Sequence, residues 1–269
     1  MVMQGCQSEK FGGCNQTESF SGFKDPHKTE HETDDDRLEQ RPDHLLVRHD
    51  KVPYDLPIIL GSGSPRRYEL IRRFWPHADI DVKKPVVNEA SLIQRLIPRY
   101  CLRDVAAELT RAKMEALKAD LSLPDECMVL TADTMVIADG RILGKPADAQ
   151  EAFTMLRTLS GKKHIVVTGL CLETHLHKKK LCLQTVERTE VWFGELDDAM
   201  IKWYIQTGEP FDKAGAYGIQ GYGAAFIERL SGCYYNVMGL PVFRLMDLLQ
   251  QTADHFKLDK NLYHILPWN

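Results

Sequence analysis

The segment that most constrains the fold is a transition from strand to loop to helix near residue 60. Residues 57–60 form an apolar run typical of a short buried strand, and the glycines and serines of residues 61–64 follow it. Ser64 then stands at the N-cap position of a helix that begins with Pro65, where a missing amide hydrogen is harmless. The pattern predicts a buried strand that ends in a glycine loop at a helix N-terminus.

Two arginines, Arg66 and Arg67, fall in the first turn of this predicted helix. Cations are disfavoured there because the helix dipole is positive at its N-terminus, so a bound anion is a simple compensation. The residues match neither the Gly-Lys-Ser/Thr phosphate loop nor a complete Gly-x-Gly-x-x-Gly fingerprint. A phosphate cradle and a plain turn with two surface arginines therefore both remain open at this point.

Composition is typical of a globular protein with a sizeable core. Of 269 residues, 43% are hydrophobic and 27% charged, and the formal net charge is -4. An acidic balance argues against general nucleic-acid binding, and no apolar run reaches membrane-spanning length. Seven cysteines without a Cys-x-x-Cys pair are typical of a reducing compartment. We therefore expect a cytoplasmic protein with no nucleic-acid or membrane partner.

The first 52 residues differ from the rest of the chain. They are rich in Gly, Gln, Ser, His and acids, and they lack apolar periodicity. Such a segment buries too little surface to offset its ordering entropy. We expect residues 1–52 to be a disordered or loosely attached extension, and residues 53–269 to form the domain.

Strand and helix patterns alternate along the domain. The expected strands are residues 57–60, 80–87, 128–132, 165–172, 181–193 and 225–230 with a hairpin over 135–143, and the expected helices are 65–74, 101–121, 148–159, 196–207 and 241–251. Helices interleave with strands while hairpins intrude, which predicts an α/β fold with a mixed central sheet. We expect His175 and His177, in the turn before residue 181, to face solvent rather than bind a ligand.

Charged residues stand at predicted strand ends and in loops, beside glycine or proline: Glu89, Asp133, Lys145, Asp212 and Lys213. A charge at the end of an apolar strand is unfavourable unless something there uses it. Taken singly, each is more often part of a structural ion pair. Together with the two arginines they suit phosphoanhydride chemistry, because cations neutralise phosphates and carboxylates bind Mg²⁺ jointly with them.

Several blocks of the chain resemble signatures of the Maf family of nucleoside triphosphate pyrophosphatases. The blocks are residues 60–67, 132–134, 144–146, 159–161 with His164 and 168–169, 208–221 and 239–241. They run in unbroken order over about residues 56–250, and the block 208–221 is highly specific. The N-terminal extension and the last residues lie outside the resemblance.

The resemblance implies an inosine-triphosphatase-like (Maf/Ham1) fold, with helices on both sides of a mixed sheet and two lobes around a cleft. It implies hydrolysis of a nucleoside triphosphate between its α and β phosphates with Mg²⁺ or Mn²⁺. A homodimer is a possible oligomeric state. The intact blocks 132–134 and 218–221 look like the branch that prefers dTTP and UTP. A modified pyrimidine nucleotide is an equally sensible target.

The resemblance also implies roles for single positions. Asp133 matches the proton acceptor that activates water. Glu89, Asp133 and Asp212 match the residues that bind the metal and its water. Residues 87–89 depart from the family's usual Asp-Glu pairing. Lys113 and Lys145 match catalytic, phosphate-contacting positions. Substrate binding and choice are implied for Ser62, Ser64, Arg66, Arg67, Thr134, Lys213 and Gln220. Gln220 carries both the donor and the acceptor that a pyrimidine edge requires, although a satisfied loop residue is the alternative.

Two other functions stay open at this stage. One is a nucleotide-sensing regulator of cell division that binds without cleaving, and the other is a phosphatase that releases orthophosphate. Metal-dependent turnover distinguishes an enzyme from the regulator. Product identity distinguishes the pyrophosphatase from the phosphatase.

Overall fold

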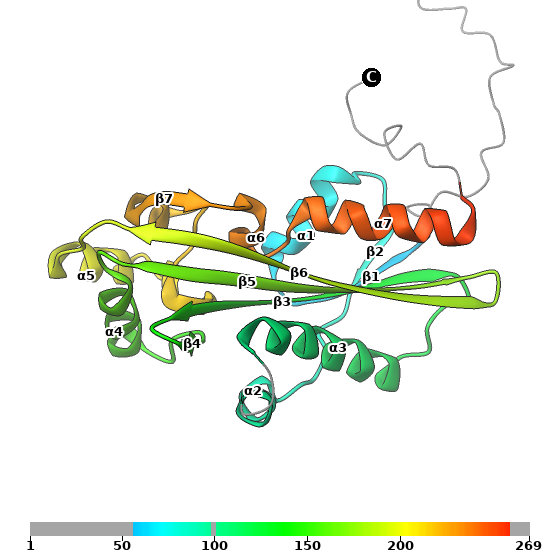
Figure 1. Cartoon of the computed structure of the whole chain (residues 1–269), viewed down its shortest axis with the longest axis horizontal. Helices are drawn as coiled ribbons and strands as arrows, with labels where there is room; N and C mark the ends of the chain where they lie inside the picture. Colours follow the sequence, from blue (N-terminus) through cyan, green and yellow to red (C-terminus); the bar gives the residue numbers. More distant parts are fainter. Residues whose placement is uncertain (1–55, 98–100, 259–269) are drawn as a thin grey trace, which may run out of the picture. The chain divides into compact units, whose positions relative to one another are not determined.

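A computed structural model describes residues 56–97 and 101–258 and centres on one seven-stranded mixed sheet (Figure 1). The strand order is β2-β1-β3-β5-β6-β7, and β4 pairs with β3 off this path. The strands are β1 (Ile58–Gly61), β2 (Ile80–Val82), β3 (Cys127–Ala138), β4 (Arg141–Leu143), β5 (Lys163–Leu176), β6 (Lys179–Phe193) and β7 (Ile227–Ser231). The extension predicted for residues 1–52 lies outside the described residues.

Both strand directions occur in the sheet. β1 pairs in parallel with β2 and with β3. The other pairs are antiparallel: β3 with β4, β3 with β5, β5 with β6, and β6 with β7. The parallel pairs require crossover connections, which the helices after β1 and β2 supply. The expectation of a mixed central sheet in an α/β fold is confirmed.

Helices cover the two faces of the sheet (Figure 1). The helices are α1 (Pro65–Phe74), α2 (Glu89–Leu96), α3 (Leu102–Asp120), α4 (Ala149–Leu159), α5 (Asp198–Gln206), α6 (Tyr234–Met238) and α7 (Val242–Phe256), with 3-10 turns η3 (Glu209–Asp212), η4 (Ala214–Ala216) and η5 (Tyr222–Phe226). Side chains of β3 alternate between the faces: Met128 and Leu130 pack with α1 and α7, and Val129 packs with α3. Within the described ranges, no helix is long and apolar enough to cross a membrane.

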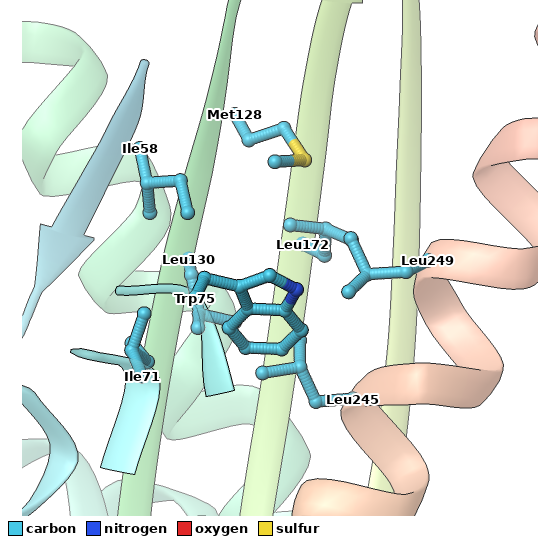
Figure 2. A pocket seen from close by; sticks show the side chains of 8 residues that line it. All are labelled: Ile58, Ile71, Trp75, Met128, Leu130, Leu172, Leu245 and Leu249. Atoms are coloured by element: carbon cyan, nitrogen blue, oxygen red, sulfur yellow. The ribbon is translucent and has the colours of Figure 1, made fainter. Parts of the chain in front are cut away.

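A small apolar cavity of about 20 Å³ lies between the sheet, α1 and α7 (Figure 2). Trp75 extends across it, and Leu245 and Leu249 of α7 approach from the other side. A space of this size with an apolar lining holds no stable water. The cavity is a packing feature of the core and adds nothing to the candidate site.

The strand expected over residues 80–87 is too long. β2 ends at Val82, and Asn88 caps α2 by accepting a hydrogen bond from the Ser91 amide (3.0 Å). Among the described residues β2 pairs with β1 alone, and β1 ends at Gly61, so pairing stops soon after the hydrogen bond from the Lys83 amide to the Leu60 carbonyl oxygen (3.0 Å). Glu89 therefore lies in the first turn of a helix that the sequence pattern did not predict.

The expectation that Asp133 follows the end of a strand is also wrong. β3 continues from Cys127 to Ala138, so Asp133 lies in its middle. The strand continues because β5 pairs with it from Cys127 to Ile137 and satisfies its backbone on that side. The segment expected as the first arm of a separate hairpin is the second half of the same strand.

His175 does not face solvent, contrary to expectation. It lies in β5, is 6% exposed, and its Nε2 is 2.7 Å from Glu173 Oε1. The turn is shorter than expected because β5 and β6 pair up to Leu176 and Lys179. Only His177 and Lys178 remain in the turn, both with positive φ, and His177 is exposed as expected.

Candidate active site

The candidate residues gather where the sheet is interrupted beside β3. β1 pairs with β3 only up to Thr131, and β4 pairs with β3 only from Val136. Within the described chain, residues 132–135 therefore pair with β5 alone. We call this interruption the sheet gap. Asp133 and Thr134 lie at its centre, and the loop after β1 runs beside it.

Three charged side chains meet on the face that α3 covers. Lys113 of α3 forms ion pairs with Asp133 and with Glu89, and its Nζ lies 2.8 Å from Glu89 Oε1. Lys113 and Asp133 are each 7% exposed, whereas about half of the Glu89 side chain is accessible. One ammonium group thus bridges two carboxylates at the boundary between core and solvent.

Close packing of α3 on β5 brings Lys113 over the sheet gap. Gly169 of β5 pairs with Asp133, and a Cβ atom at Gly169 would lie 2.6 Å from the Ala106 carbonyl oxygen. A side chain here would push the helix away from the sheet. Lys113 lies two turns after Ala106, on the face of α3 that includes the buried Thr110.

Burial alters the proton affinity of Asp133. Removal from water is the largest influence and raises the pKa of this carboxyl above its ordinary value, and the negative Glu89 adds to the increase. The cations of Lys113 and Arg67 oppose it. A carboxylate with a raised pKa is a stronger base than one in water.

Arg67 is the central side chain on the opposite face. Its guanidinium donates hydrogen bonds from Nε to the Gly239 carbonyl oxygen (2.8 Å), from Nη1 to Ser62 Oγ (2.7 Å) and from Nη2 to Thr134 Oγ1 (2.9 Å). Ser62 Oγ also accepts from the Ser64 amide (3.2 Å). Arg67 thereby connects the start of α1, the preceding loop, β3 and the turn before α7.

The polar contacts continue beneath Thr134. Its Oγ1 lies 2.9 Å from Thr168 Oγ1, and Thr168 donates to the Asn236 carbonyl oxygen (3.1 Å). Asn236 Nδ2 donates in turn to Thr189 Oγ1 (2.9 Å). Sequence reasoning missed Asn236 and Thr189. Thr168 fell in a recognised block, but nothing in the sequence marked it as support for Thr134.

A second ionic cluster lies nearer the surface. Arg66 Nη1 is 3.1 Å from Asp212 Oδ2, and Lys213 Nζ is 2.6 Å from Asp212 Oδ1. These cations lower the pKa of Asp212 against the opposing effect of partial burial. Arg66 and Arg67 are neighbours in α1, so the second cluster adjoins the Arg67 contacts.

The remaining candidates have fewer contacts. Ser64 is the N-cap residue of α1, but its hydroxyl forms no capping bond. Lys145 is exposed in the loop after β4, and this loop is joined to η4 by a hydrogen bond from the Gly215 amide to the Gly144 carbonyl oxygen (2.9 Å). Gln220 is exposed in the loop before η5. No hydrogen bond among the described residues joins either side chain to Asp133 or Arg67.

The carboxylates fit a divalent metal only in part. Glu89 and Asp133 already converge on one cation, Lys113, and oxygen ligands suit Mg²⁺. Asp212 is engaged by Arg66 and Lys213 instead, and the described residues include no group of three acidic, His or Cys side chains placed to hold a metal. A metal at Glu89 and Asp133 would take its other ligands from water and substrate.

Comparison with known proteins identifies the family of this chain. A family model described as Maf-like protein matches residues 57–252. This chain belongs to the Maf family. The matched span contains every candidate residue named above.

Curated members of the Maf family resemble the chain over nearly their whole length. The dTTP/UTP pyrophosphatase of Carboxydothermus hydrogenoformans is 43% identical over 196 residues, which is 73% of this chain and 98% of the relative. The dTTP/UTP pyrophosphatase of Pyrococcus horikoshii is 44% identical over 191 residues, 71% of this chain and 94% of the relative. The protein of the same name from Clostridium beijerinckii is 40% identical over 197 residues, which is 73% of this chain and 99% of the relative.

Proposed function

We propose that this protein is a nucleoside triphosphate pyrophosphatase that hydrolyses dTTP or UTP to the monophosphate and pyrophosphate. A modified pyrimidine nucleotide is an alternative substrate of the same chemistry. The observation that carries the proposal is the buried Asp133 carboxylate, which shares the Lys113 ammonium group with Glu89 and lies beside the arginines of α1. The names of the curated relatives support the same activity.

The charge balance around the sheet gap favours a polyanionic substrate. Burial lowers the pKa of Arg67, which indicates that its positive charge is incompletely compensated where it lies. Phosphate oxygens would supply that compensation and accept hydrogen bonds from the guanidinium groups. Five cationic side chains outnumber the three candidate carboxylates. We assign binding of the triphosphate to these cations: Arg66, Arg67, Lys113, Lys145 and Lys213.

Asp133 is the proposed general base. Its raised proton affinity suits abstraction of a proton from water, and its place in a rigid strand fixes the direction of that water. Lys113 keeps the carboxylate ionised and orients it. Attack of the activated water on the α–β linkage releases the nucleoside monophosphate and pyrophosphate.

We propose a divalent ion, Mg²⁺ or Mn²⁺, that Glu89 and Asp133 would hold, with Asp212 as a further candidate ligand. When bound, such an ion would neutralise charge on the phosphate oxygens. Removal of metal with a chelator should abolish turnover, and addition of Mg²⁺ or Mn²⁺ should restore it. Turnover that persists in excess chelator would exclude the metal.

We assign base selection to Thr134, Arg66 and Gln220. Gln220 projects from an exposed loop and offers both a donor and an acceptor to a pyrimidine edge. The catalytic domain would be residues 53–269, which includes the matched span 57–252. We also propose a cytoplasmic protein without nucleic-acid or membrane partners, with a monomer or a homodimer to be decided by light scattering.

The test is a product assay. The purified protein is mixed with Mg²⁺ and dTTP, UTP, CTP, dATP or dGTP, and monophosphate, pyrophosphate and orthophosphate are quantified. Equal amounts of monophosphate and pyrophosphate, fastest with dTTP or UTP, are expected. Release of orthophosphate alone would support the phosphatase instead, and saturable binding without products would support the regulator.

A further inference from the structure

Glu209, at the start of η3, holds the loop that carries Gln220. Its Oε2 accepts a hydrogen bond from the Tyr222 amide (2.8 Å), and its Oε1 accepts from the Gly223 amide (3.2 Å). Oε1 also accepts from the hydroxyl of Tyr204 (2.8 Å). One carboxylate thus binds three donors, two of them main-chain amides two and three residues after Gln220. We call residues 218–223 the glutamine loop.

Tyr204 holds the other end of the glutamine loop. Its side chain extends from α5 and is completely buried, and its hydroxyl oxygen accepts a hydrogen bond from the Gly218 amide (3.1 Å). The hydroxyl therefore connects Gly218 to Glu209. Gln220 lies between the two attachment points and is itself exposed.

The glycines of the glutamine loop leave room for this carboxylate. A Cβ atom at Gly221 would lie 2.1 Å from Glu209 Oε2, and one at Gly218 would lie 3.0 Å from Oε1 and 2.5 Å from Lys213 Cε. Any side chain at Gly221 would therefore displace the carboxylate. The spacing of glycines around Gln220 matches the space that the Glu209 side chain occupies.

Glu209 also contacts the cations proposed for the triphosphate. Its carbonyl oxygen accepts a hydrogen bond from Lys213 Nζ (2.8 Å). Lys213 pairs with Asp212, and Asp212 pairs with Arg66. An uninterrupted series of contacts therefore runs from the arginine at the start of α1 to the glutamine loop. The carbonyl oxygen of Glu209 contacts Lys213, and its carboxylate contacts the glutamine loop.

We propose that Glu209 is a positioning residue for base selection, which fixes the glutamine loop so that Gln220 meets the nucleobase while the triphosphate is bound. This inference rests on the proposed function. Glu209 does not touch substrate or the reacting atoms, and it acts through the main chain of residues 222 and 223. Its removal should weaken discrimination between bases more than the chemical step.

Glutamine at this position retains the length and shape of the side chain but changes the pattern of donors and acceptors. A carboxylate has acceptors on both oxygens, whereas an amide directs one N–H₂ group toward donors. In Glu209→Gln, at least one of the Tyr222 and Gly223 amides loses its acceptor. The loop should therefore loosen without loss of the α5 core. Tyr204→Phe is the second variant, because it removes the attachment of Gly218 and preserves the ring packing.

The experiment measures kcat and KM for dTTP and dGTP, together with hydrogen exchange over residues 218–223. In Glu209→Gln we expect the ratio of kcat/KM for dTTP to that for dGTP to fall about tenfold, mainly through KM for dTTP. Exchange over the glutamine loop should accelerate, and kcat for dGTP should stay within about threefold of wild type. Tyr204→Phe should also lower the ratio of kcat/KM values and accelerate exchange over the glutamine loop. Glu228→Gln, an exposed glutamate of β7, is the matched control and should change neither.

Faster exchange with an unchanged ratio in both variants would overturn the inference, because the loop would then be loose without effect on base choice. An equal loss of kcat for both nucleotides would also overturn it and would leave Glu209 a purely structural role. If the wild-type protein cleaves no nucleotide, the proposed function fails and this inference with it. If the wild-type protein is active and both variants keep its ratio of kcat/KM for dTTP to kcat/KM for dGTP, this inference fails and the proposed function stands.

Discussion

Asp133 and Thr134 are adjacent in β3, and their side chains lie on opposite faces of the sheet. Asp133 pairs with Lys113 of α3, and Thr134 accepts a hydrogen bond from Arg67 of α1. Alternation along a strand requires this separation. In the proposed function the acid and the arginine serve one ligand, and the sheet gap, which leaves this stretch of β3 without a paired strand on one side in the described chain, is where that ligand would reach both.

Substitution of Asp133 tests the proposed base. Asp133→Asn retains the shape but cannot accept a proton, so kcat should fall about 10²- to 10⁴-fold. The melting temperature should not drop greatly, because burial already disfavours the charge at this position. Pyrophosphate release and thermal unfolding are the measurements. Asp139→Asn, in the exposed turn after β3, is the matched control, and an Asp133→Asn protein as active as wild type would remove Asp133 from the mechanism.

The neighbouring arginines should respond differently to alanine. Arg67→Ala removes three hydrogen bonds made by a buried guanidinium, to Gly239, Ser62 and Thr134, and should destabilise the protein by about 3 kcal/mol. Arg66→Ala removes an ion pair with an exposed carboxylate and should change stability by less than about 1 kcal/mol. It should instead raise KM for the nucleotide about tenfold. Urea unfolding and steady-state kinetics check both results, and equal destabilisation by the two variants would contradict the separation.

Gly169 should tolerate no side chain. In Gly169→Ala the new methyl group would lie 2.6 Å from the main chain of α3, so the helix must shift. We expect a loss of about 1–3 kcal/mol in the free energy of unfolding and a lower kcat, because Lys113 moves with α3. Gly144→Ala is the stability control, since a Cβ atom there meets nothing within 4 Å. A stable Gly169→Ala protein would show that α3 adjusts freely.

His164 should make the protein sensitive to mild acid. It is buried in β5 beside Phe193, its Nε2 lies 2.8 Å from the Tyr217 hydroxyl, and burial lowers the pKa of His164 from 6.5 to about 4. The unfolded chain therefore binds a proton at a pH where the folded chain does not. Stability is lost as pH falls below 6.5, by about 2 kcal/mol between pH 7.5 and pH 5.

Urea unfolding across this pH range measures the effect of His164. His164→Gln, which cannot gain a proton, should show a shallower dependence than wild type over the same interval. Parallel curves for the two proteins would mean that the folded imidazole gains its proton over the same pH range as it does in the unfolded chain.

Sequence patterns predicted the mixed sheet and most helices because each has a clear periodicity and a recognisable cap. Asp148 accepts a hydrogen bond from the Glu151 amide at the start of α4, and Gly208 has a positive φ just after α5. The length of β2 could not be predicted, because it depends on where the neighbouring strand ends. The burial of His175 likewise depends on Glu173, which offers a carboxylate across the same face.

The candidate site was predictable as a set of residue types but not as an arrangement. The resemblance named Arg67 and Thr134 without indicating that they bind each other. Asn236 lay outside the recognised blocks, and Glu209 lay inside the block 208–221 without a role of its own, because the roles of both arise from contacts with main-chain groups distant in sequence. Whether the site lies between two lobes stays a prediction.

The tight turn at His177 and Lys178 offers a place for protein engineering. It begins nine residues after Thr168, roughly 30 Å at the rise of an extended strand. Both residues are exposed, and the strands beside them pair without a bulge. A reporter domain inserted there, or new chain termini created there, would leave the residues of the candidate site in register.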